Sequence, residues 1–180
     1  MANLKWKYKV IPKLLNSAEL KLAHEYCKQR HITNTDSFDE RQNNCGDTYF
    51  YKDPLIQVFL KNKKKILEKN INLKLNETYT FWRCYTYGAK LKKHIDRPAC
   101  ELSVTVFIGS DGEYEWPIYM DGKKIDLKPG DGVIYRGCDI LHWREPYEGD
   151  YHIQAFLHYV DANGKYANHK GDNINENLTK

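Results

Sequence analysis

The segment His94-Ile95-Asp96 places an imidazole and a carboxylate two residues apart. In an extended strand, residues i and i+2 point to the same face and lie roughly 6.5 Å apart along the chain. His94 and Asp96 can therefore approach one metal ion from the same side. Two histidines and one carboxylate form the facial triad of non-haem Fe(II) oxygenases, so this pair needs one further histidine. The alternative is an ordinary polar pair on the surface, because the H-x-D motif is short and common.

His142 is the candidate for the third ligand. It follows the turn sequence Pro129-Gly130-Asp131-Gly132 and a short apolar stretch, so a strand would deliver His142 at its far end. If that strand runs antiparallel beside the strand that carries His94, the two imidazoles lie opposite each other. His152, His158 and His169 also follow in the chain, so the residues alone leave the third ligand open.

The first 70 residues predict a strand and two helices that would support this site. Residues 4–15 alternate apolar and polar side chains, which favours a strand that turns at Pro12. Helical periodicity follows over residues 18–31, with Asn16 or Ser17 as N-cap. A polar, irregular stretch at 31–48 is interpreted as a loop. A second helix is predicted over 54–70, because Asp-Pro at 53–54 is a capping signal.

From residue 71 the sequence is typical of strands. Apolar and polar residues alternate at 102–108, and Asp121-Gly122 stands between two strand-like runs, which predicts a hairpin. Further strands are predicted within 73–88, 128–137 and 151–161, and a frayed polar tail over 162–180. Helices followed by about seven strands predict an α+β domain with a β-sandwich or barrel.

The length and composition indicate one soluble domain. A chain of 180 residues fits a single core, which we divide into supporting elements (1–70), a β core (71–161) and the tail (162–180). No run approaches the roughly 18 apolar residues of a membrane span, and the start lacks the features of a secretory signal. We therefore expect a cytoplasmic protein that does not bind membranes.

The cysteines and the charge exclude two other classes. Five scattered cysteines without a C-x-x-C pair predict free thiols rather than a disulfide framework or zinc knuckle. The net charge is +4, and the basic run at 61–70 is interleaved with apolar residues. This run is interpreted as the solvated face of a helix rather than a nucleic-acid footprint.

Residues 80–161 resemble the Fe(II)/2-oxoglutarate-dependent oxygenases, particularly the prolyl 4-hydroxylase-like branch. The resemblance begins with Tyr85-x-x-Gly88, which His94-x-Asp96 follows six residues later. The strand SVTVFIGS, the segment LKPGDGVIYRG and His142, 48 residues after His94, come next. Pro146, Gly149 and the closing strand IQAFLHYVD complete the pattern. The order and spacing of these pieces together carry the resemblance.

This resemblance implies a double-stranded β-helix (jelly roll) core with N-terminal supporting helices. It implies Fe(II) as the metal, held by His94, Asp96 and His142, with 2-oxoglutarate and O2 as co-substrates and ascorbate as reductant. The implied reaction hydroxylates a prolyl or other amino-acid or peptide substrate, with succinate and CO2 as co-products. The presence of Asp96 favours hydroxylation, because halogenating relatives lack this carboxylate. Two alternatives stay open: the same reaction on a nucleobase or small metabolite, and a cupin-like metal- or ligand-binding module without oxygenase activity.

The resemblance also implies roles for residues around the metal. Tyr85 stands where the hydroxylases place a tyrosine that hydrogen-bonds the co-substrate. The family places an Arg or Lys nine or ten residues after the distal histidine, but Tyr151 and His152 occupy these positions. Either His152, if protonated, or Arg144, on the same strand face as His142, could bind the distal carboxylate of 2-oxoglutarate. Arg97, directly after Asp96, is a candidate for substrate binding.

Overall fold

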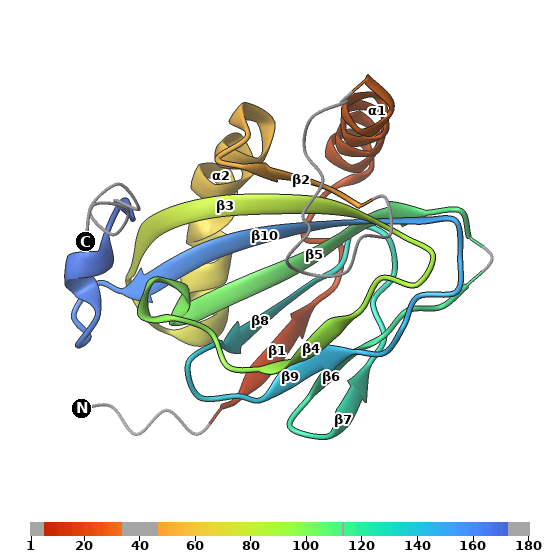
Figure 1. Cartoon of the computed structure of the whole chain (residues 1–180). Coiled ribbons are helices and arrows are strands. Elements are labelled where there is room, and N and C mark those ends of the chain that lie inside the picture. The colour runs from red at the N-terminus through yellow and green to blue at the C-terminus, as the bar shows by residue number, and fades with distance from the viewer. Residues whose placement is uncertain (1–5, 34–46, 113, 173–180) are drawn as a thin grey trace, which may run out of the picture.

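Two antiparallel sheets face each other and form the body of the molecule (Figure 1). The computed structural model describes residues 6–33, 47–112 and 114–172. The larger sheet has the strand order β1 (Tyr8–Ile11), β8 (Gly132–Arg136), β5 (Leu102–Ser110), β10 (Tyr151–Asp161), β3 (Leu75–Thr86) and β2 (Thr48–Tyr51). The smaller sheet has the order β4 (Leu91–His94), β9 (His142–Arg144), β6 (Ile118–Met120) and β7 (Lys123–Ile125). This arrangement confirms the predicted α+β, jelly-roll architecture.

Two helices cover the outer face of the larger sheet, and the smaller sheet lies on its other side (Figure 1). Helix α1 (Ser17–Thr33) begins with a capping box, in which Asn16 Oδ1 accepts from the amide of Glu19 while the Glu19 carboxylate accepts from the amide of Asn16. Helix α2 (Pro54–Ile71) begins at the predicted cap, Asp53. Neither helix combines the length and the apolar character needed to cross a membrane.

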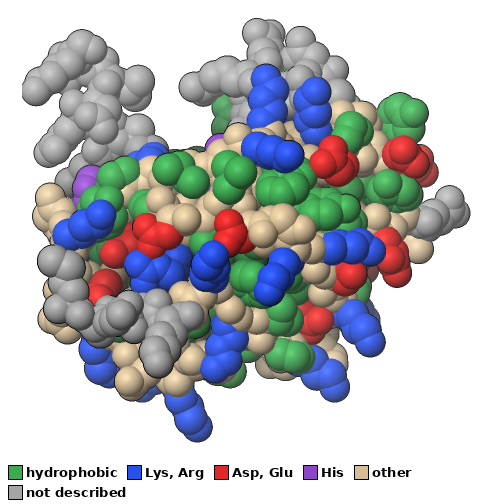
Figure 2. Space-filling model, turned by 90° about the horizontal axis from the view of Figure 1, so that it is seen from below, with side chains coloured by type: hydrophobic (Ala, Val, Ile, Leu, Met, Phe, Trp, Pro, Cys, Tyr) green, Lys and Arg blue, Asp and Glu red, His purple; other side chains and the backbone are tan. Residues whose placement is uncertain are grey.

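Helix α2 is amphipathic, as the interleaved basic run predicted. Its buried residues pack on the sheet and are Ile56, Phe59, Leu60, Leu67 and Ile71. Three lysines of the run (Lys61, Lys65 and Lys69) are exposed, whereas Lys63 and Lys64 are partly buried and pair with Glu19 and Glu77. On the face shown in Figure 2, Lys and Arg side chains are interspersed with Asp and Glu rather than gathered into one band.

Strand β5 is buried on both faces, and the two faces differ in chemistry. Leu102, Val104, Val106 and Ile108 belong to the apolar core beneath the helices. Each such side chain contributes about 1.5–3 kcal/mol when fully buried. Ser103, Thr105 and Phe107 point into the space between the sheets, where they contact Asp96, Gln154 and His152 respectively. The period-two alternation therefore separates a hydrophobic core from a polar barrel interior.

The hairpin at Asp121-Gly122 joins β6 to β7, as predicted. Both residues have positive φ angles, 54° and 81°, as a two-residue type I′ turn requires. The predicted free thiols agree with Cys27, Cys84, Cys100 and Cys138, none of which forms a disulfide within the described residues. Cys45 lies outside the described residues.

Four local expectations differ from the structure. His142 was expected at the far end of the strand after the Pro129–Gly132 turn, but that strand, β8, ends at Arg136, and His142 begins the separate strand β9 in the smaller sheet. Strand β2 was not predicted, because it is a four-residue edge strand that pairs only with β3 and follows a polar stretch. The expected loop at 31–48 is shorter, since α1 continues to Thr33; residues 34–46 lie outside the described residues. The tail was expected to fray, but its described part, through Asp172, folds back on the body and includes the short helix η3 (Ala167–His169).

Candidate metal centre and co-substrate pocket

The three predicted metal ligands lie together at one end of the barrel. Strands β4 and β9 pair so that His94 lies directly opposite His142, and their ring centroids are 4.2 Å apart. Asp96 Oδ1 lies 3.5 Å from Nε2 of each imidazole. One donor atom from each residue lies within 4.8 Å of the other two. The paired strands β4 and β9 and the chain beyond β4 thus bring one carboxylate and two imidazoles to a single point.

Both imidazoles are held with Nε2 directed at this point. Nδ1 of His94 lies 2.7 Å from the carbonyl oxygen of Lys92, and Nδ1 of His142 lies 2.9 Å from that of Ile140. A carbonyl oxygen can only accept, so each Nδ1 carries a proton, and each imidazole in its neutral form presents its lone pair at Nε2. This is the arrangement by which proteins fix the tautomer of a metal-binding histidine.

Asp96 is oriented by its neighbours and is ionised. Its Oδ2 accepts a hydrogen bond of 2.8 Å from the hydroxyl of Ser103, which leaves Oδ1 for the metal position. Burial alone would raise the pKa of Asp96, but hydrogen bonding to His142 and His94 outweighs it and holds the pKa well below its usual range. The same contact with Asp96 raises the pKa of His94. Two imidazoles and an ionised carboxylate form a donor set that fits divalent iron.

Ser103 and His158 form a hydrogen-bonded chain that holds Asp96, and the sequence did not predict this role. Ser103 Oγ lies 2.9 Å from Nδ1 of His158. Because the single hydroxyl proton of Ser103 goes to the Asp96 carboxylate, Nδ1–H of His158 donates to Ser103 Oγ. Burial lowers the pKa of His158 to about 4, so this imidazole is neutral. The available signal was the alternation of β5, which points Ser103 into the barrel.

Gly137 makes room for Asp96. The backbone amide of Asp96 donates to the carbonyl oxygen of Gly137, at 2.8 Å. A Cβ atom at position 137 would overlap with Asp96 Oδ2 and with the carbonyl oxygen of Cys100. The carboxylate therefore packs directly against bare backbone, which requires glycine at this position.

Both candidates for binding the distal carboxylate of 2-oxoglutarate line one cavity toward the other end of the barrel. This cavity has a volume of about 430 Å³, and its lining includes Arg144, His152, Phe107, Trp116 and Leu127. Tyr85 lies opposite His152 in the pairing of β3 with β10, and its ring packs edge-on against Trp116. The structure thus gathers the three predicted co-substrate residues in one region.

Arg144 is a buried cation that pairs with no carboxylate in the described part of the chain. Its side chain donates to the carbonyl oxygen of Trp116 and lies 4.7 Å from the centre of the Trp116 ring. Within residues 6–33, 47–112 and 114–172, no Asp or Glu forms an ion pair with it. Burial lowers its pKa to about 10, so it is still charged at neutral pH. A buried charge costs several kcal/mol unless an opposite charge compensates it, so this site favours an anion.

His152 does not carry a charge in this cavity. Burial and the nearby charge of Arg144 lower its pKa to about 3. Its Nε2 lies 2.8 Å from Oε1 of Gln154, whose amide nitrogen in turn donates to Thr105. Nδ1 has no hydrogen-bond partner among the described residues. Between the two open alternatives, the electrostatics favour Arg144.

Arg97 directly follows Asp96 in the chain, and its side chain contacts the C-terminal segment. Its guanidinium makes a two-pronged ion pair with the Asp172 carboxylate, at 3.0 and 2.5 Å. It also lies 4.7 Å from the centre of the Tyr79 ring. The contact with Asp172 was not foreseen, because 75 residues separate the two in sequence.

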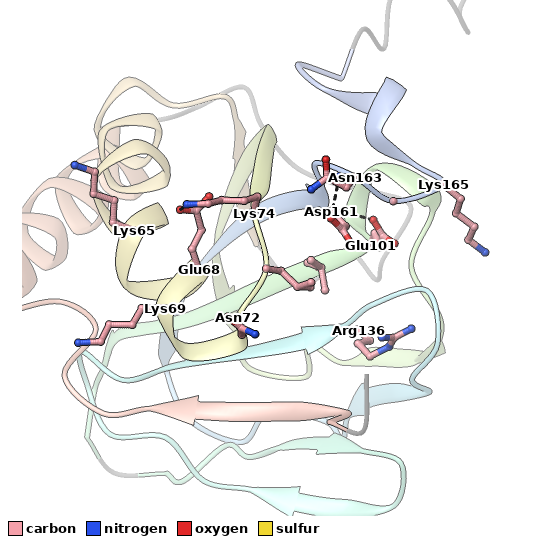
Figure 3. Close-up of a pocket in the computed structure, with 13 residues that line it drawn as sticks. Lys65, Glu68, Lys69, Asn72, Lys74, Glu101, Arg136, Asp161, Asn163 and Lys165 are labelled. Atoms are coloured by element: carbon pink, nitrogen blue, oxygen red, sulfur yellow. Dashed lines mark hydrogen bonds and ion pairs between the residues drawn. The ribbon is translucent and has the colours of Figure 1, made fainter. Parts of the chain in front are cut away.

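A second hollow is a groove of about 1250 Å³ between the end of α2 and the end of β10 (Figure 3). Long charged side chains line it, and its acids are already engaged: Glu68 accepts from the amide of Leu75, and Glu101 from that of Asp161. It contains none of the residues predicted for the site. The groove therefore lies outside the candidate active site.

No protein-family model and no curated protein matches the sequence. The fold does match solved structures. A prolyl-4-hydroxylase of Pseudomonas putida superposes with a TM-score of 0.70 at 16% identity, over 87% of this chain and 94% of that one. The viral collagen prolyl hydroxylase of Paramecium Bursaria Chlorella virus-1, in complex with 2-oxoglutarate, gives 0.63 at 16% identity, over 86% and 96%.

A third match is the non-haem α-ketoglutarate-dependent epimerase SnoN from nogalamycin biosynthesis, with a TM-score of 0.71 at 11% identity over 87% of this chain and 79% of that one. These likenesses establish the fold. The resemblance in fold to the 2-oxoglutarate-dependent oxygenases, prolyl 4-hydroxylases among them, is thereby confirmed.

Proposed function

We propose that this chain, which has the fold of the Fe(II)/2-oxoglutarate-dependent oxygenases, is a dioxygenase that hydroxylates an amino-acid or peptidyl substrate. The observation that carries the proposal is the convergence of His94, Asp96 and His142, with both Nε2 atoms and Oδ1 free to bind one ion. Three protein ligands leave three positions of an octahedral ion for co-substrates. When bound, Fe(II) would supply the activation of O2 that oxidises 2-oxoglutarate and the substrate.

In this proposal Arg144 binds the distal carboxylate of 2-oxoglutarate. It lies on β9 two residues beyond His142, so both side chains point into the barrel. An entering dicarboxylate would neutralise the buried guanidinium, and charge-assisted hydrogen bonds of this kind are among the strong ones. Tyr85 lines the same region and would contribute its phenol as a neutral hydrogen-bond donor. His152 would act as an uncharged wall of this pocket.

The barrel interior would keep water from the reacting centre. Strand β10 contributes Gln154 and Phe156 to the interior, and Phe156 stacks near His158 at the metal end. Aromatic and buried polar side chains therefore surround the space between the triad and Arg144. Ser103 and His158 would keep Asp96 directed at the metal throughout the reaction.

Peptidyl or free amino acids, proline first, are the proposed substrates. The support is the fold shared with a prolyl-4-hydroxylase and a collagen prolyl hydroxylase, as those proteins are named. Asp96 completes the triad, which suits hydroxylation, and ascorbate is the proposed reductant. A binding module without oxygenase activity would have no need for a buried arginine that faces this cavity and pairs with no carboxylate among the described residues.

Succinate formation tests the proposal. The protein is incubated with Fe(II), ascorbate, O2 and 2-oxoglutarate, with and without proline and proline-containing peptides. We expect succinate in all cases, more of it with an accepted substrate, and a loss to background in His94→Ala, Asp96→Ala and His142→Ala. His24→Ala, on the outer helix α1, is the matched control and should retain activity. Metal binding without any succinate would instead support a cupin-like module.

A further inference from the structure

A preformed carboxylate site is formed by Arg97, the residue that follows Asp96, and Asp172 occupies it. Arg97 provides two guanidinium contacts to this carboxylate. Tyr51 donates its hydroxyl to Asp172 Oδ2 at 3.1 Å, and Lys52 Nζ lies 3.1 Å from the Asp172 carbonyl oxygen. We call Arg97, Tyr51 and Lys52 the Arg97 cradle. Burial raises the pKa of Asp172, but the contact with Arg97 outweighs this and lowers the pKa, so the carboxylate is ionised.

The cradle is connected to the metal site through packed side chains. Arg97 directly follows the candidate ligand Asp96 and lies over the ring of Tyr79. The ring of Tyr79 packs against His158 with centroids 4.4 Å apart, and His158 contacts the serine that orients Asp96. The cradle is thus linked by direct contacts to the residues that orient Asp96.

The segment that delivers Asp172 is held mainly by polar contacts. None of the residues of η3 is buried. Gly171 and Asp172 both have positive φ angles, 80° and 36°, and the latter is uncommon for a residue with a side chain. The contacts at the end of the segment are the cradle and one backbone hydrogen bond from Gly171 to Glu77. Because little apolar surface holds the segment, an external carboxylate can compete with Asp172.

We propose that the Arg97 cradle is the subsite for a carboxylate of the substrate, and that Asp172 is an internal occupant which the substrate displaces. The inference rests on the proposed function and narrows its substrate class to amino acids or peptides with a carboxylate near the hydroxylated carbon. The carboxylate is either the free terminal group or an acidic side chain. Displacement makes the C-terminal segment a built-in competitor of the substrate.

Chemical footprinting of Arg97 tests this inference without measuring turnover. Protein loaded with Mn(II) and 2-oxoglutarate is treated with phenylglyoxal under nitrogen, and the modification of Arg97 is quantified by mass spectrometry. The probes are N-acetylglycine, with a terminal carboxylate, N-acetylaspartate α-amide, with a side-chain carboxylate, and N-acetylglycinamide, which has none. The difference between the first two probes identifies the source of the carboxylate.

We expect Asp172→Asn to make Arg97 react faster than in the unaltered protein. One of the two carboxylate probes should restore protection, with an apparent Kd about tenfold lower in Asp172→Asn than in the unaltered chain, because the competing occupant is gone. N-acetylglycinamide should give no protection. Asp139→Asn, which removes the carboxylate from the exposed ion pair with Arg136, is the matched control and should leave Arg97 unaffected.

The inference would be overturned if neither carboxylate probe protected Arg97, in Asp172→Asn or in the unaltered protein at high probe concentration. The ion pair between Arg97 and Asp172 would then be a purely structural contact. Because protection is also measured in the unaltered protein, a folding defect in Asp172→Asn cannot be mistaken for a missing subsite. Succinate formation by the unaltered protein is measured in parallel. If succinate forms but no probe protects Arg97, the subsite fails while the proposed function stands.

Discussion

Arg144 and His152 line the same cavity, and burial together with the charge of Arg144 lowers the pKa of His152 to about 3. The two basic residues are therefore not equivalent, although the sequence left both open. One is a permanent cation on the strand that carries His142, and the other is a neutral ring on the last strand. In the proposed enzyme the residue that binds the distal carboxylate of 2-oxoglutarate would be Arg144 on β9, rather than a basic residue on the closing strand.

Substitution of Arg144 should weaken 2-oxoglutarate binding far more than substitution of His152. We expect Arg144→Met to raise the Kd roughly 10- to 100-fold, since a hydrogen bond to a charged group contributes about 1.5–3 kcal/mol. Arg144→Lys should recover only part of this, because an ammonium lacks the planar two-pronged geometry. Isothermal titration calorimetry on the Mn(II)-loaded protein measures these affinities.

His152→Asn is the matched comparison, and it should change the Kd by only a few fold. If His152→Asn weakened 2-oxoglutarate binding more than Arg144→Met, the assignment of Arg144 would be contradicted. His152, on the closing strand, would then be the residue that binds the distal carboxylate.

Removal of the Ser103 hydroxyl should weaken metal binding. In Ser103→Ala the Asp96 carboxylate loses its 2.8 Å hydrogen bond and with it a fixed orientation. Loss of such an outer contact typically lowers metal affinity about 10- to 100-fold. Competition titration with a fluorescent chelator measures the Kd for Co(II). Ser110→Ala, at the other end of β5, is the control; equal affinities for the two variants would show that Ser103 does not orient the ligand.

The stability of the metal-free protein should fall as the pH is lowered from about 6.5 toward 4. The pKa values of buried His152 and His158 are about 3 and about 4 in the folded state, whereas in the unfolded chain histidine titrates near 6.5. Between these values the unfolded state binds protons that the native state does not, so acid favours unfolding. From pH 7 to pH 5 each histidine should remove about 2 kcal/mol of stability.

Urea titrations at the two pH values, in the presence of a chelator, measure this dependence. Over the same pH interval, His152→Gln should lose about 2 kcal/mol less stability than the unaltered protein, because it has one buried histidine fewer. Identical pH dependence in the two proteins would refute the assignment of a buried neutral imidazole at position 152.

Gly137→Ala should impair the metal site specifically. The added methyl group would overlap with Asp96 Oδ2 and must displace the carboxylate or the backbone of Cys100. We expect a loss of metal affinity of at least tenfold, comparable to loss of an outer contact. Gly112→Ala is the control, because a Cβ atom there meets open space and costs only backbone strain at φ 84°. Unchanged Co(II) affinity in Gly137→Ala would show that Asp96 has room to move.

Much of the architecture could be predicted because its signals are local. The caps at Asn16 and Asp53, the Asp121-Gly122 turn and the alternation of β5 each depend on a few neighbouring residues. Strand β2 escaped prediction because an edge strand of four residues is defined by its partner β3 rather than by its own sequence. The convergence of His142 with His94 is non-local, and only the spacing shared with known oxygenases indicated it.

The choice between Arg144 and His152 could not be made from the sequence, for a physical reason. Whether a histidine is charged depends on burial and on neighbouring charges, which come from distant strands. The contact between Arg97 and Asp172 likewise joins the ends of a 75-residue interval. Neither residue type nor spacing contains this information.

The pairing of β4 with β9 is short, with Leu91 opposite Arg144 and His94 opposite His142. An ion held by both histidines and by Asp96 would act as a cross-link between two strands that share few hydrogen bonds. Filling the site and ordering this edge of the barrel would then be one coupled equilibrium. Slower amide exchange in β4 and β9 after metal addition, with β5 and β10 unchanged, would be its signature.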